Sequence, residues 1–183
     1  MIYLMRHGQD DENYIGGWSD VELIPEGIKD VEMMGEWIKD NLNIKQIICS
    51  DVRRAVHTAD IINSYLNVKV IQLSDFREQS KGKLNGMLKT DAQKEYPEYF
   101  KNVSINTVYP DGECLKDLYN KVKLYLDKLS KIEDNTLIIT HRGYINMIYY
   151  LLNNVPLDMN KKRFNVDTAS LHEFDGETIR RIK

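Results

Sequence analysis

The chain has 183 residues, 42% of them hydrophobic and 29% charged, which suffices for one hydrophobic core and predicts a single domain over residues 1–183. Its 25 basic and 28 acidic residues give a net charge of −3. This balance argues against the basic surface of a protein that binds nucleic acid or anionic membrane, so any affinity for phosphate has to be local.

Neither a targeting segment nor a disulfide framework is predicted. The first apolar run, Ile2–Met5, is too short for a signal peptide, and no run approaches the roughly 20 residues of a transmembrane helix. We therefore expect a cytoplasmic protein. Cys49 and Cys114 lie far apart, without the spacing of a zinc site, and we expect both to be reduced and structural.

In the first half of the chain, short β-rich runs alternate with longer segments whose apolar residues recur every three to four positions. The elements expected in order are a strand at Ile2–Met5, a helix at Glu26–Leu42, a strand at Gln46–Cys49, a helix at Arg54–Leu66 and a more exposed strand at Val68–Ile71. Ser50 or Asp51 is the expected N-cap of the second helix.

The second half continues the alternation and ends in a hairpin. The elements expected there are a helix at Leu115–Leu129, a strand at Thr136–Thr140, a buried helix at Tyr144–Leu152, and strands at Ser170–Phe174 and Thr178–Ile182. Asp175-Gly176 is a good turn between the last two. Strands alternating with helices, several of them apolar throughout, predict a three-layer α/β/α sandwich with a mainly parallel central sheet.

Residues whose side chains can react or bind an anion follow the predicted strands. They are Arg6–Gly8, Ser50–Arg54, Asp75–Glu78 and His141–Gly143. Because ligands bind beyond the carboxyl ends of strands in open α/β sheets, two histidines, several arginines and a carboxylate should face one crevice. Arginine forks match phosphate oxygens, and we expect backbone donors of the helix N-termini near Ser50 and Gly143 to add to them. A histidine in that setting is either a further donor or a nucleophile.

An ordered set of motifs supports the same chemistry. They are Arg6–Gln9 with Asn13, Leu23–Gly27, Ser50–Ala59, Phe76–Glu78 with Gly82 and Gly86, Gly112–Cys114, and Thr140-His141. In this order they resemble the motifs of the histidine phosphatase (phosphoglycerate mutase-like) superfamily over nearly the whole chain. The resemblance places the family arginine of the second motif at Arg54.

The resemblance implies a mechanism for phosphoryl transfer. His7 would attack phosphorus, while Glu78 would protonate the leaving oxygen and then deprotonate the water that hydrolyses the phosphohistidine. The residues expected to hold the phosphate are Arg6, Arg54, His141, Gln9, Asn13 and Arg142, of which the first three also stabilise the developing charge. The reacting nitrogen of His7 must be unprotonated, and we expect a backbone carbonyl to fix the other nitrogen.

We expect neither a metal nor another cofactor, because the arginines supply the positive charge. A two-histidine metal site is the competing interpretation. Arginines beside both histidines would oppose a bound cation, and no third ligand has recognisable spacing. His57 and His172 do not follow a strand in this way, so we assign them structural or surface roles, while Arg53, Arg77 and Arg142 are candidates for the border of the pocket.

Three functions compete. The first is a metal-independent phosphomonoesterase acting on a small phosphorylated metabolite, for which the resemblance implies phosphoserine, a sugar phosphate or alpha-ribazole phosphate. The second is a phosphoglycerate-type mutase, and the third a catalytically weak phosphate-binding module. Hydrolysis is favoured because the family's mutases are longer chains, whereas here only Met87–Pro110 is available to keep water out. This segment either sets substrate choice or is an ordinary surface helix and loop; the oligomeric state is not indicated.

Several positions depart from the family pattern. Asp10 stands where the family usually has threonine, and Arg142 replaces the first glycine after the second histidine. With Asp11 and Glu12, Asp10 makes an acidic run near the pocket, which is either a solvated loop or selects a substrate with a cationic part. Arg142 either contacts a second anionic group or points outward. The acid-bearing loop keeps Glu78 but has Lys81, Leu84 and Asn85 in place of aromatic and acidic residues, and Cys114 replaces serine.

Overall fold

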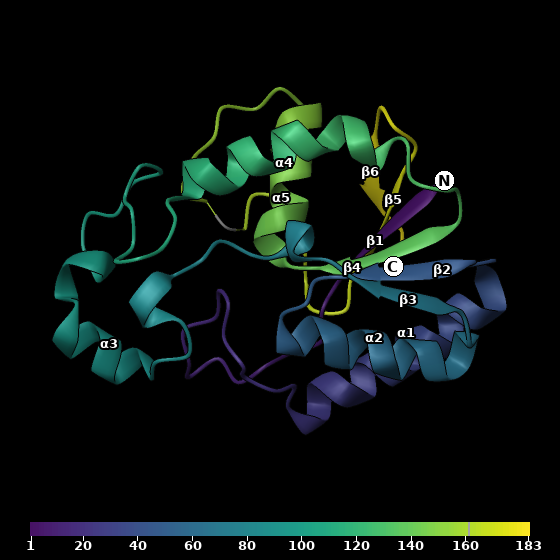
Figure 1. Ribbon diagram of the computed structural model, residues 1–183, viewed down its shortest axis with the longest axis horizontal. Coiled ribbons are helices and arrows are strands. Elements are labelled where there is room, and N and C mark those ends of the chain that lie inside the picture. The colour runs from purple at the N-terminus through teal and green to yellow at the C-terminus, as the bar shows by residue number, and fades with distance from the viewer. Residues whose placement is uncertain (161) are drawn as a thin grey trace.

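The computed structural model describes residues 1–160 and 162–183, and it forms a three-layer sandwich around a mixed sheet (Figure 1). The strands are β1 (Ile2–Arg6), β2 (Gln46–Cys49), β3 (Lys69–Gln72), β4 (Thr136–Thr140), β5 (Leu171–Phe174) and β6 (Ile179–Arg181). They lie in the order β3-β2-β4-β1-β5-β6. The first four in this order are parallel to one another. β5 pairs antiparallel with β1, and β6 pairs antiparallel with β5 to form the predicted hairpin. The mainly parallel sheet is confirmed.

Helices cover both faces of the sheet. They are α1 (Pro25–Asn41) and α2 (Arg53–Leu66) on one face and α4 (Leu115–Leu129) and α5 (Arg142–Leu152) on the other. The short helix α3 (Lys89–Glu95) lies away from the sheet, beyond the carboxyl ends of β2, β3 and β4 (Figure 1). Single 3-10 turns occur at Ser74–Phe76, Gly82–Leu84 and Pro97–Phe100. None of the helices within the described residues is long and apolar enough to cross a bilayer.

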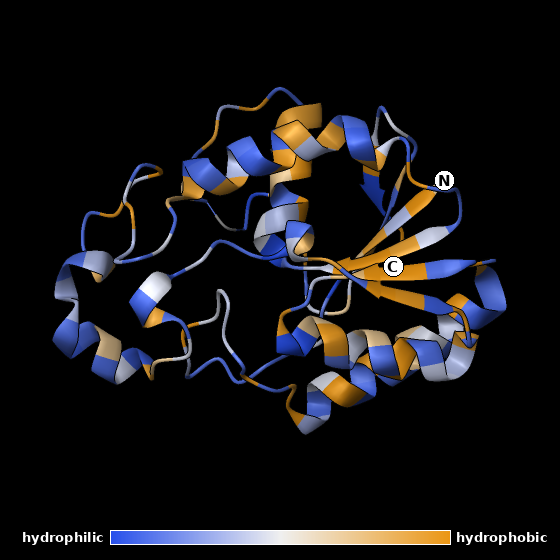
Figure 2. Ribbon diagram, viewed as in Figure 1, coloured by the Kyte–Doolittle hydropathy of each residue, from blue (hydrophilic) through white to orange (hydrophobic). Residues whose placement is uncertain are grey.

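The strands contribute to two separate hydrophobic clusters because successive side chains point to opposite faces of the sheet. In β4, Ile138 belongs to the cluster under α4 and α5, whereas Leu137 and Ile139 belong to the one under α1 and α2. Figure 2 shows the result as central strands that are apolar over most of their length, with amphipathic helices outside them. Burial on both faces explains why these strands were recognisable as continuous apolar runs.

The register of β1 and β4 fixes the position of both predicted site histidines. Arg6 lies opposite Thr140, at the carboxyl ends of the two parallel neighbours. The next residues are His7 and His141, and the backbone N–H of His7 donates to the carbonyl of Thr140 at 3.0 Å. Two residues 134 positions apart in the chain therefore become neighbours through strand pairing.

The start of α2 differs from the prediction. The helix begins at Arg53, and its N-cap is Val52, whose side chain offers no capping hydrogen bond. Neither Ser50 nor Asp51 caps it: the Ser50 hydroxyl is engaged by His141, and Asp51 forms two hydrogen bonds of 2.6 Å with Arg77. Ser50 serves the site and Asp51 the acid-bearing loop, although the Ser50 hydroxyl also accepts the N–H of Val52 at 3.3 Å.

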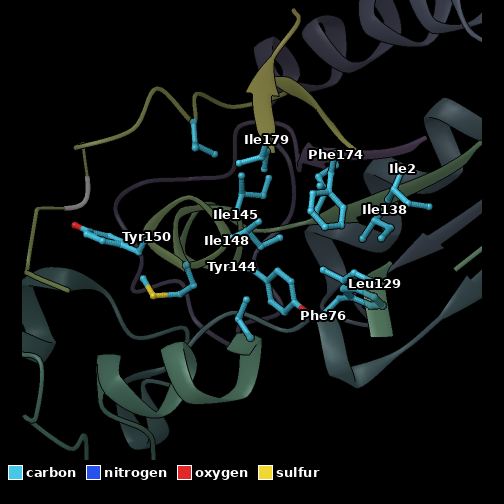
Figure 3. Packing of buried hydrophobic residues seen from close by; sticks show 14 of the residues in the cluster. Ile2, Phe76, Leu129, Ile138, Tyr144, Ile145, Ile148, Tyr150, Phe174 and Ile179 are labelled. Carbon is cyan, nitrogen blue, oxygen red and sulfur yellow. The ribbon is translucent and has the colours of Figure 1, made fainter. Parts of the chain in front are cut away.

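A buried aromatic contact anchors the loop that carries Glu78. Tyr144 of α5 and Phe76 lie side by side in the cluster drawn in Figure 3, with ring centroids 5.5 Å apart. The hydroxyl of Thr140 also donates to the carbonyl of Phe76 at 2.7 Å. The end of β4 and the start of α5 therefore hold the loop two residues before its carboxylate.

Candidate active site

A cleft of about 670 Å³ opens at the carboxyl edge of the sheet. It is lined by Arg6, His7, Arg54 and Glu78, together with residues from segments 10–17, 79–115 and 142–162. His7 and Arg54 are 4% and 2% exposed, so the cleft reaches down to almost completely buried polar groups. The crevice predicted from the residues that follow the strands is present.

His7 directly follows β1 and is held in one tautomer. Its Nδ1 lies 2.7 Å from the carbonyl oxygen of Gly8, and its Nε2 lies 3.0 Å from Nε of Arg54. Since a carbonyl accepts and a guanidinium donates, Nδ1 carries the proton and Nε2 presents its lone pair. Burial, followed by the charges of Arg54 and Arg6, holds the pKa of His7 well below its ordinary value. The ring is therefore neutral near pH 7, with a nucleophilic nitrogen at Nε2.

His141 follows β4 and is completely buried, with its ring centroid 5.1 Å from that of His7. Its Nδ1 lies 3.1 Å from Nη2 of Arg54, and its Nε2 lies 2.8 Å from the hydroxyl of Ser50. Nδ1 thus accepts from the guanidinium, and Nε2–H donates to Ser50. Burial and the charge of Arg54 also hold the pKa of His141 well below its ordinary value. His141 is not among the residues that line the cleft, and it supports Arg54; its role as a phosphate contact stays a prediction.

Arg54, in the first turn of α2, connects both histidines. Besides its bonds to them, Nη1 donates to the hydroxyl of Ser19 at 3.2 Å and Nη2 to the carbonyl of Gly17 at 2.8 Å. The hydroxyl of Thr58 donates to the carbonyl of Arg54 and accepts the N–H of Gly8, which ties α2 to the turn after β1. A guanidinium fixed at this many points is preorganised for an anion.

Arg6 supplies a second guanidinium to the cleft. Its Nη1 donates to the carbonyl of Val166 at 3.0 Å, while its buried Nε has no partner among the residues described. Burial, followed by the nearby charge of Arg142, lowers the pKa of Arg6 to about 10, so the group stays cationic near neutral pH. The site thus gathers positive charge in a protein whose net charge is −3.

Glu78 faces the same cleft with its carboxylate fixed by backbone donors. Oε1 accepts the N–H of Gln79 at 2.9 Å, and Oε2 accepts the N–H of Gly143 at 2.8 Å. The N–H groups of Gly143 and Ser50 themselves are therefore already used, and phosphate donors from other first-turn N–H groups stay a prediction. Gly143 serves Glu78, and the N–H of Ser50 donates to the carbonyl of Ile139 within the sheet.

Two loops that approach Glu78 are joined by residues without a sequence signal. The indole Nε1 of Trp18 donates to the carbonyl of Glu78 at 2.7 Å. The side-chain oxygen of Asn85 accepts the N–H groups of Trp18 and Lys81 at 3.0 and 2.9 Å. Asn85 therefore connects the loop that carries Gly17 and Ser19 to the acid-bearing loop.

Asp10 lines the cleft and contacts its central guanidinium. Its Oδ2 lies 3.5 Å from Nε of Arg54, and its side chain is 16% exposed. Asp11 and Glu12 line the cleft as well. The ion pair and the backbone bridge to Leu23 hold Asp10 at the site, whereas Glu12 is exposed. Selection of a substrate with a cationic part stays a prediction.

Other predicted residues are distributed differently. Arg142 lines the cleft, whereas Gln9 and Asn13 do not, and the amide of Asn13 donates to Asp11. Their roles as phosphate contacts stay predictions. Arg53 and Arg77 also lie outside the cleft lining, paired with Glu22 and Asp51.

The remaining histidines and both cysteines have local partners or buried positions. His57 lies 3.2 Å from Glu22. His172 is buried between the hydroxyls of Tyr149 and Ser170, each at 2.9 Å. Cys49 and Cys114 are free and buried, and the latter forms the N-cap of α4 in a reciprocal pair with Asp117.

The segment Met87–Pro110 forms one wall of the cleft. Its lining residues are Lys89, Tyr99, Phe100, Val103, Ser104, Thr107 and Tyr109. Tyr99 and Tyr109 stack with centroids 5.2 Å apart, which gives this wall a rigid aromatic element. The segment is thus a surface helix and loop that also lines the cleft, and its part in substrate choice stays a prediction.

No group of three or more His, Cys, Asp or Glu side chains is placed to hold a metal ion in the part of the chain that the structure describes. The chemistry available in the cleft is instead a neutral imidazole nucleophile, fixed guanidinium groups and a carboxylate. Together these groups can bind a phosphoryl group and accept it covalently.

Comparison with known proteins agrees with this chemistry. The model of the histidine phosphatase superfamily (branch 1) matches residues 2–181. The chain belongs to this superfamily. A relative called "Uncharacterized phosphatase PhoE" of Bacillus subtilis is 30% identical to this family member over 184 residues, covering 98% of this chain and 91% of its own. "Phosphoglycerate mutase-like protein 4" of Arabidopsis thaliana is 30% identical over 158 residues, covering 81% of this chain and 69% of its own.

A solved structure shares the fold of this chain. The alpha-ribazole phosphatase of Shigella flexneri superposes with a TM-score of 0.82, at 21% identity, over 99% of this chain and 94% of its own. Relatives of this histidine phosphatase superfamily member thus include phosphatases and mutases that act on small phosphorylated metabolites.

Proposed function

We propose that the protein is a metal-independent phosphomonoesterase that hydrolyses a small phosphorylated metabolite through a phosphohistidine on His7. The observation that carries the proposal is the state of His7: a buried, neutral imidazole whose Nδ1–H is fixed by the Gly8 carbonyl and whose Nε2 faces Arg54. A nitrogen prepared in this way is a nucleophile rather than a donor to phosphate oxygens.

The first step forms a bond between Nε2 of His7 and phosphorus and breaks the bond from phosphorus to the ester oxygen. Arg6 and Arg54 bind the equatorial oxygens, where charge develops, and His141 supports Arg54 through Nδ1. Glu78 delivers a proton to the leaving oxygen, so that an alcohol departs.

The second step reverses the role of Glu78. The carboxylate takes a proton from water, whose oxygen attacks phosphorus and displaces Nε2 of His7, which releases inorganic phosphate and restores the neutral ring. Hydrolysis rather than transfer to a second hydroxyl is supported by the short wall segment, because a mutase has to exclude water from its phosphoenzyme.

The deciding experiment measures phosphate release from a panel of phosphomonoesters in the presence of a chelator. We expect chelator-resistant turnover that His7→Ala reduces on the order of 10⁴-fold or more. His57→Ala is the matched control, since this histidine lies outside the cleft, beside Glu22. Activity that survives in His7→Ala would refute the phosphohistidine. Isomerisation of a phosphate ester without phosphate release would identify a mutase. If neither phosphate nor an isomerised ester is formed, the result would favour a binding module.

A further inference from the structure

Arg142 differs from the other arginines because its side chain has no bonding partner within residues 1–160 and 162–183. Among the described residues, no carboxylate forms an ion pair with Arg142 and no hydrogen bond reaches its side chain, whereas each of the other arginines bonds a carboxylate, a carbonyl or a histidine. Arg142 nevertheless lines the cleft. A guanidinium without a partner at the edge of a binding cleft is available to an anion from outside.

The surroundings of Arg142 make an anion more favourable still. Its charge acts against that of Arg6, which is the second cause of the lowered pKa of Arg6 after burial. Two like charges in one cleft repel each other, and an anion between or beside them offsets this repulsion. Three carboxylates, Asp10, Glu78 and Glu12, also act on Arg6. None of them forms an ion pair with Arg142 among the described residues, since Asp10 lies against Arg54 and Glu78 accepts two backbone N–H groups.

The transferred phosphate has its own binding groups. His7 and Arg54 meet it at the most buried end of the cleft. Arg142 lies near Arg6 at the start of α5, and Met147 and Tyr150 of the same helix line the cleft further along. At about 670 Å³, the cleft also has far more room than one phosphate needs.

We propose that Arg142 binds a second anionic group of the substrate, a carboxylate or another phosphate, a few bonds from the phosphorus that His7 attacks. The inference rests on the proposed phosphatase function for its meaning in catalysis. It makes Arg142 a specificity-determining residue for doubly anionic phosphomonoesters. The guanidinium fork fits either anionic group through two parallel hydrogen bonds.

The test compares two probes with the same carbon skeleton. Glycerol 3-phosphate ends in a hydroxymethyl group where 3-phosphoglycerate has a carboxylate. Binding is measured by calorimetry on the His7→Ala protein, so that the result does not depend on turnover. We expect 3-phosphoglycerate to bind at least about tenfold more tightly, and Arg142→Gln in the same background to bring the ratio of the two dissociation constants close to one.

Arg53→Gln is the matched control, because Arg53 is likewise the first residue of its helix but lies outside the cleft, paired with Glu22. It should leave the ratio unchanged. Equal affinity for the two probes in the His7→Ala protein would overturn the proposal. An equal loss of affinity for both probes in Arg142→Gln would also overturn it, because that result would place Arg142 on the transferred phosphate instead.

The same pair of esters then separates this inference from the proposed function. If His7→Ala protein binds 3-phosphoglycerate in the Arg142-dependent way but the parent releases phosphate from neither ester, the second anion site stands and the phosphatase proposal loses support. If the parent hydrolyses both with equal kcat/KM and binds both equally, the phosphatase stands and the second anion site is refuted.

Discussion

Asp10 puts a negative charge next to the guanidinium that is expected to hold the phosphate. Its carboxylate is 3.5 Å from Nε of Arg54, and the guanidinium is also fixed by Ser19, Gly17 and His141. Arg54 therefore does not need Asp10 to stay in place. The main effect of the carboxylate is to repel an arriving phosphate, since like charges about 5 Å apart interact by about 3 kcal/mol at an effective dielectric constant of 20.

We therefore predict that Asp10→Asn tightens the binding of inorganic phosphate. The expected change in the inhibition constant is about tenfold, reduced from the full Coulomb value by solvent screening. Asp11→Asn removes a charge from the same cleft but from a side chain that bonds Asn13 rather than Arg54, and should have a smaller effect. Weaker phosphate binding in Asp10→Asn would show instead that the carboxylate positions Arg54.

At the scale of elements, α5 meets the acid-bearing loop at a point where there is no room for a side chain. A Cβ atom on Gly143 would lie 2.1 Å from Oε1 of Glu78, far inside van der Waals contact. The obstacle is the end of a flexible side chain, so the carboxylate can move away without disturbing the helix. The glycine after Arg142 is thus required by the position of Glu78 and not by the backbone of α5.

Gly143→Ala should consequently reduce kcat while leaving the melting temperature near that of the parent. The expected loss approaches that of Glu78→Gln, about 10²- to 10⁴-fold for removal of a general acid. The loss should be smaller with p-nitrophenyl phosphate, whose leaving group needs no proton. In the Glu78→Gln background, Gly143→Ala should reduce kcat little further, because the two changes remove the same function. Additive losses would mean that Gly143 acts through something other than Glu78.

The hairpin strand β5 carries a buried histidine that makes the fold sensitive to acid. Burial lowers the pKa of His172 to about 4, and its ring is held by Tyr149 of α5 and by Ser170. The unfolded chain binds the proton near the ordinary value of 6.5. Between these values the unfolded state binds more protons than the native state, so stability falls as pH falls from 6.5 toward 4.

We predict that this residue contributes a loss of about 3 kcal/mol in unfolding free energy once the pH is below 4. Urea denaturation of the parent and of His172→Gln at pH 7 and pH 4.5 tests the assignment. The variant should be the less stable at pH 7, where it has lost a fitted ring, but should lose less stability on acidification. His7 and His141 act in the same direction, so some acid sensitivity should remain. Identical acid losses in both proteins would contradict the assignment.

At the scale of the whole molecule, the candidate site depends on pairing between distant strands. The parallel register that sets Arg6 opposite Thr140 brings His7 and His141 together, and α2 then places Arg54 between them. This much was predictable, because buried parallel strands are apolar throughout and ligands bind beyond their carboxyl ends. The resemblance to the family added Arg54 and Glu78 by their position within motifs.

Other parts of the site had no comparable signal. Gly17, Ser19 and Asn85 lie in irregular loops, where neither periodicity nor propensity indicates which way a side chain points. The expected cap at Ser50 or Asp51 failed for a related reason: a short polar side chain near a helix start can serve the helix or another partner, and here tertiary contacts with His141 and Arg77 prevail. Sequence rules for caps and loops therefore give several possible partners for a side chain, and tertiary contacts decide which one it bonds.

The hydrogen bond from Nε of Arg54 to Nε2 of His7 has a consequence for selectivity. As long as this hydrogen bond is formed, the lone pair that would attack phosphorus is occupied by a donor, so the ring is shielded from unrelated electrophiles. A phosphoryl group changes this because its oxygens are better acceptors for the guanidinium than the ring nitrogen is. The phosphoryl group that Arg54 binds is then also the group that frees the lone pair of His7. The histidine therefore becomes reactive only when a phosphoryl group is bound.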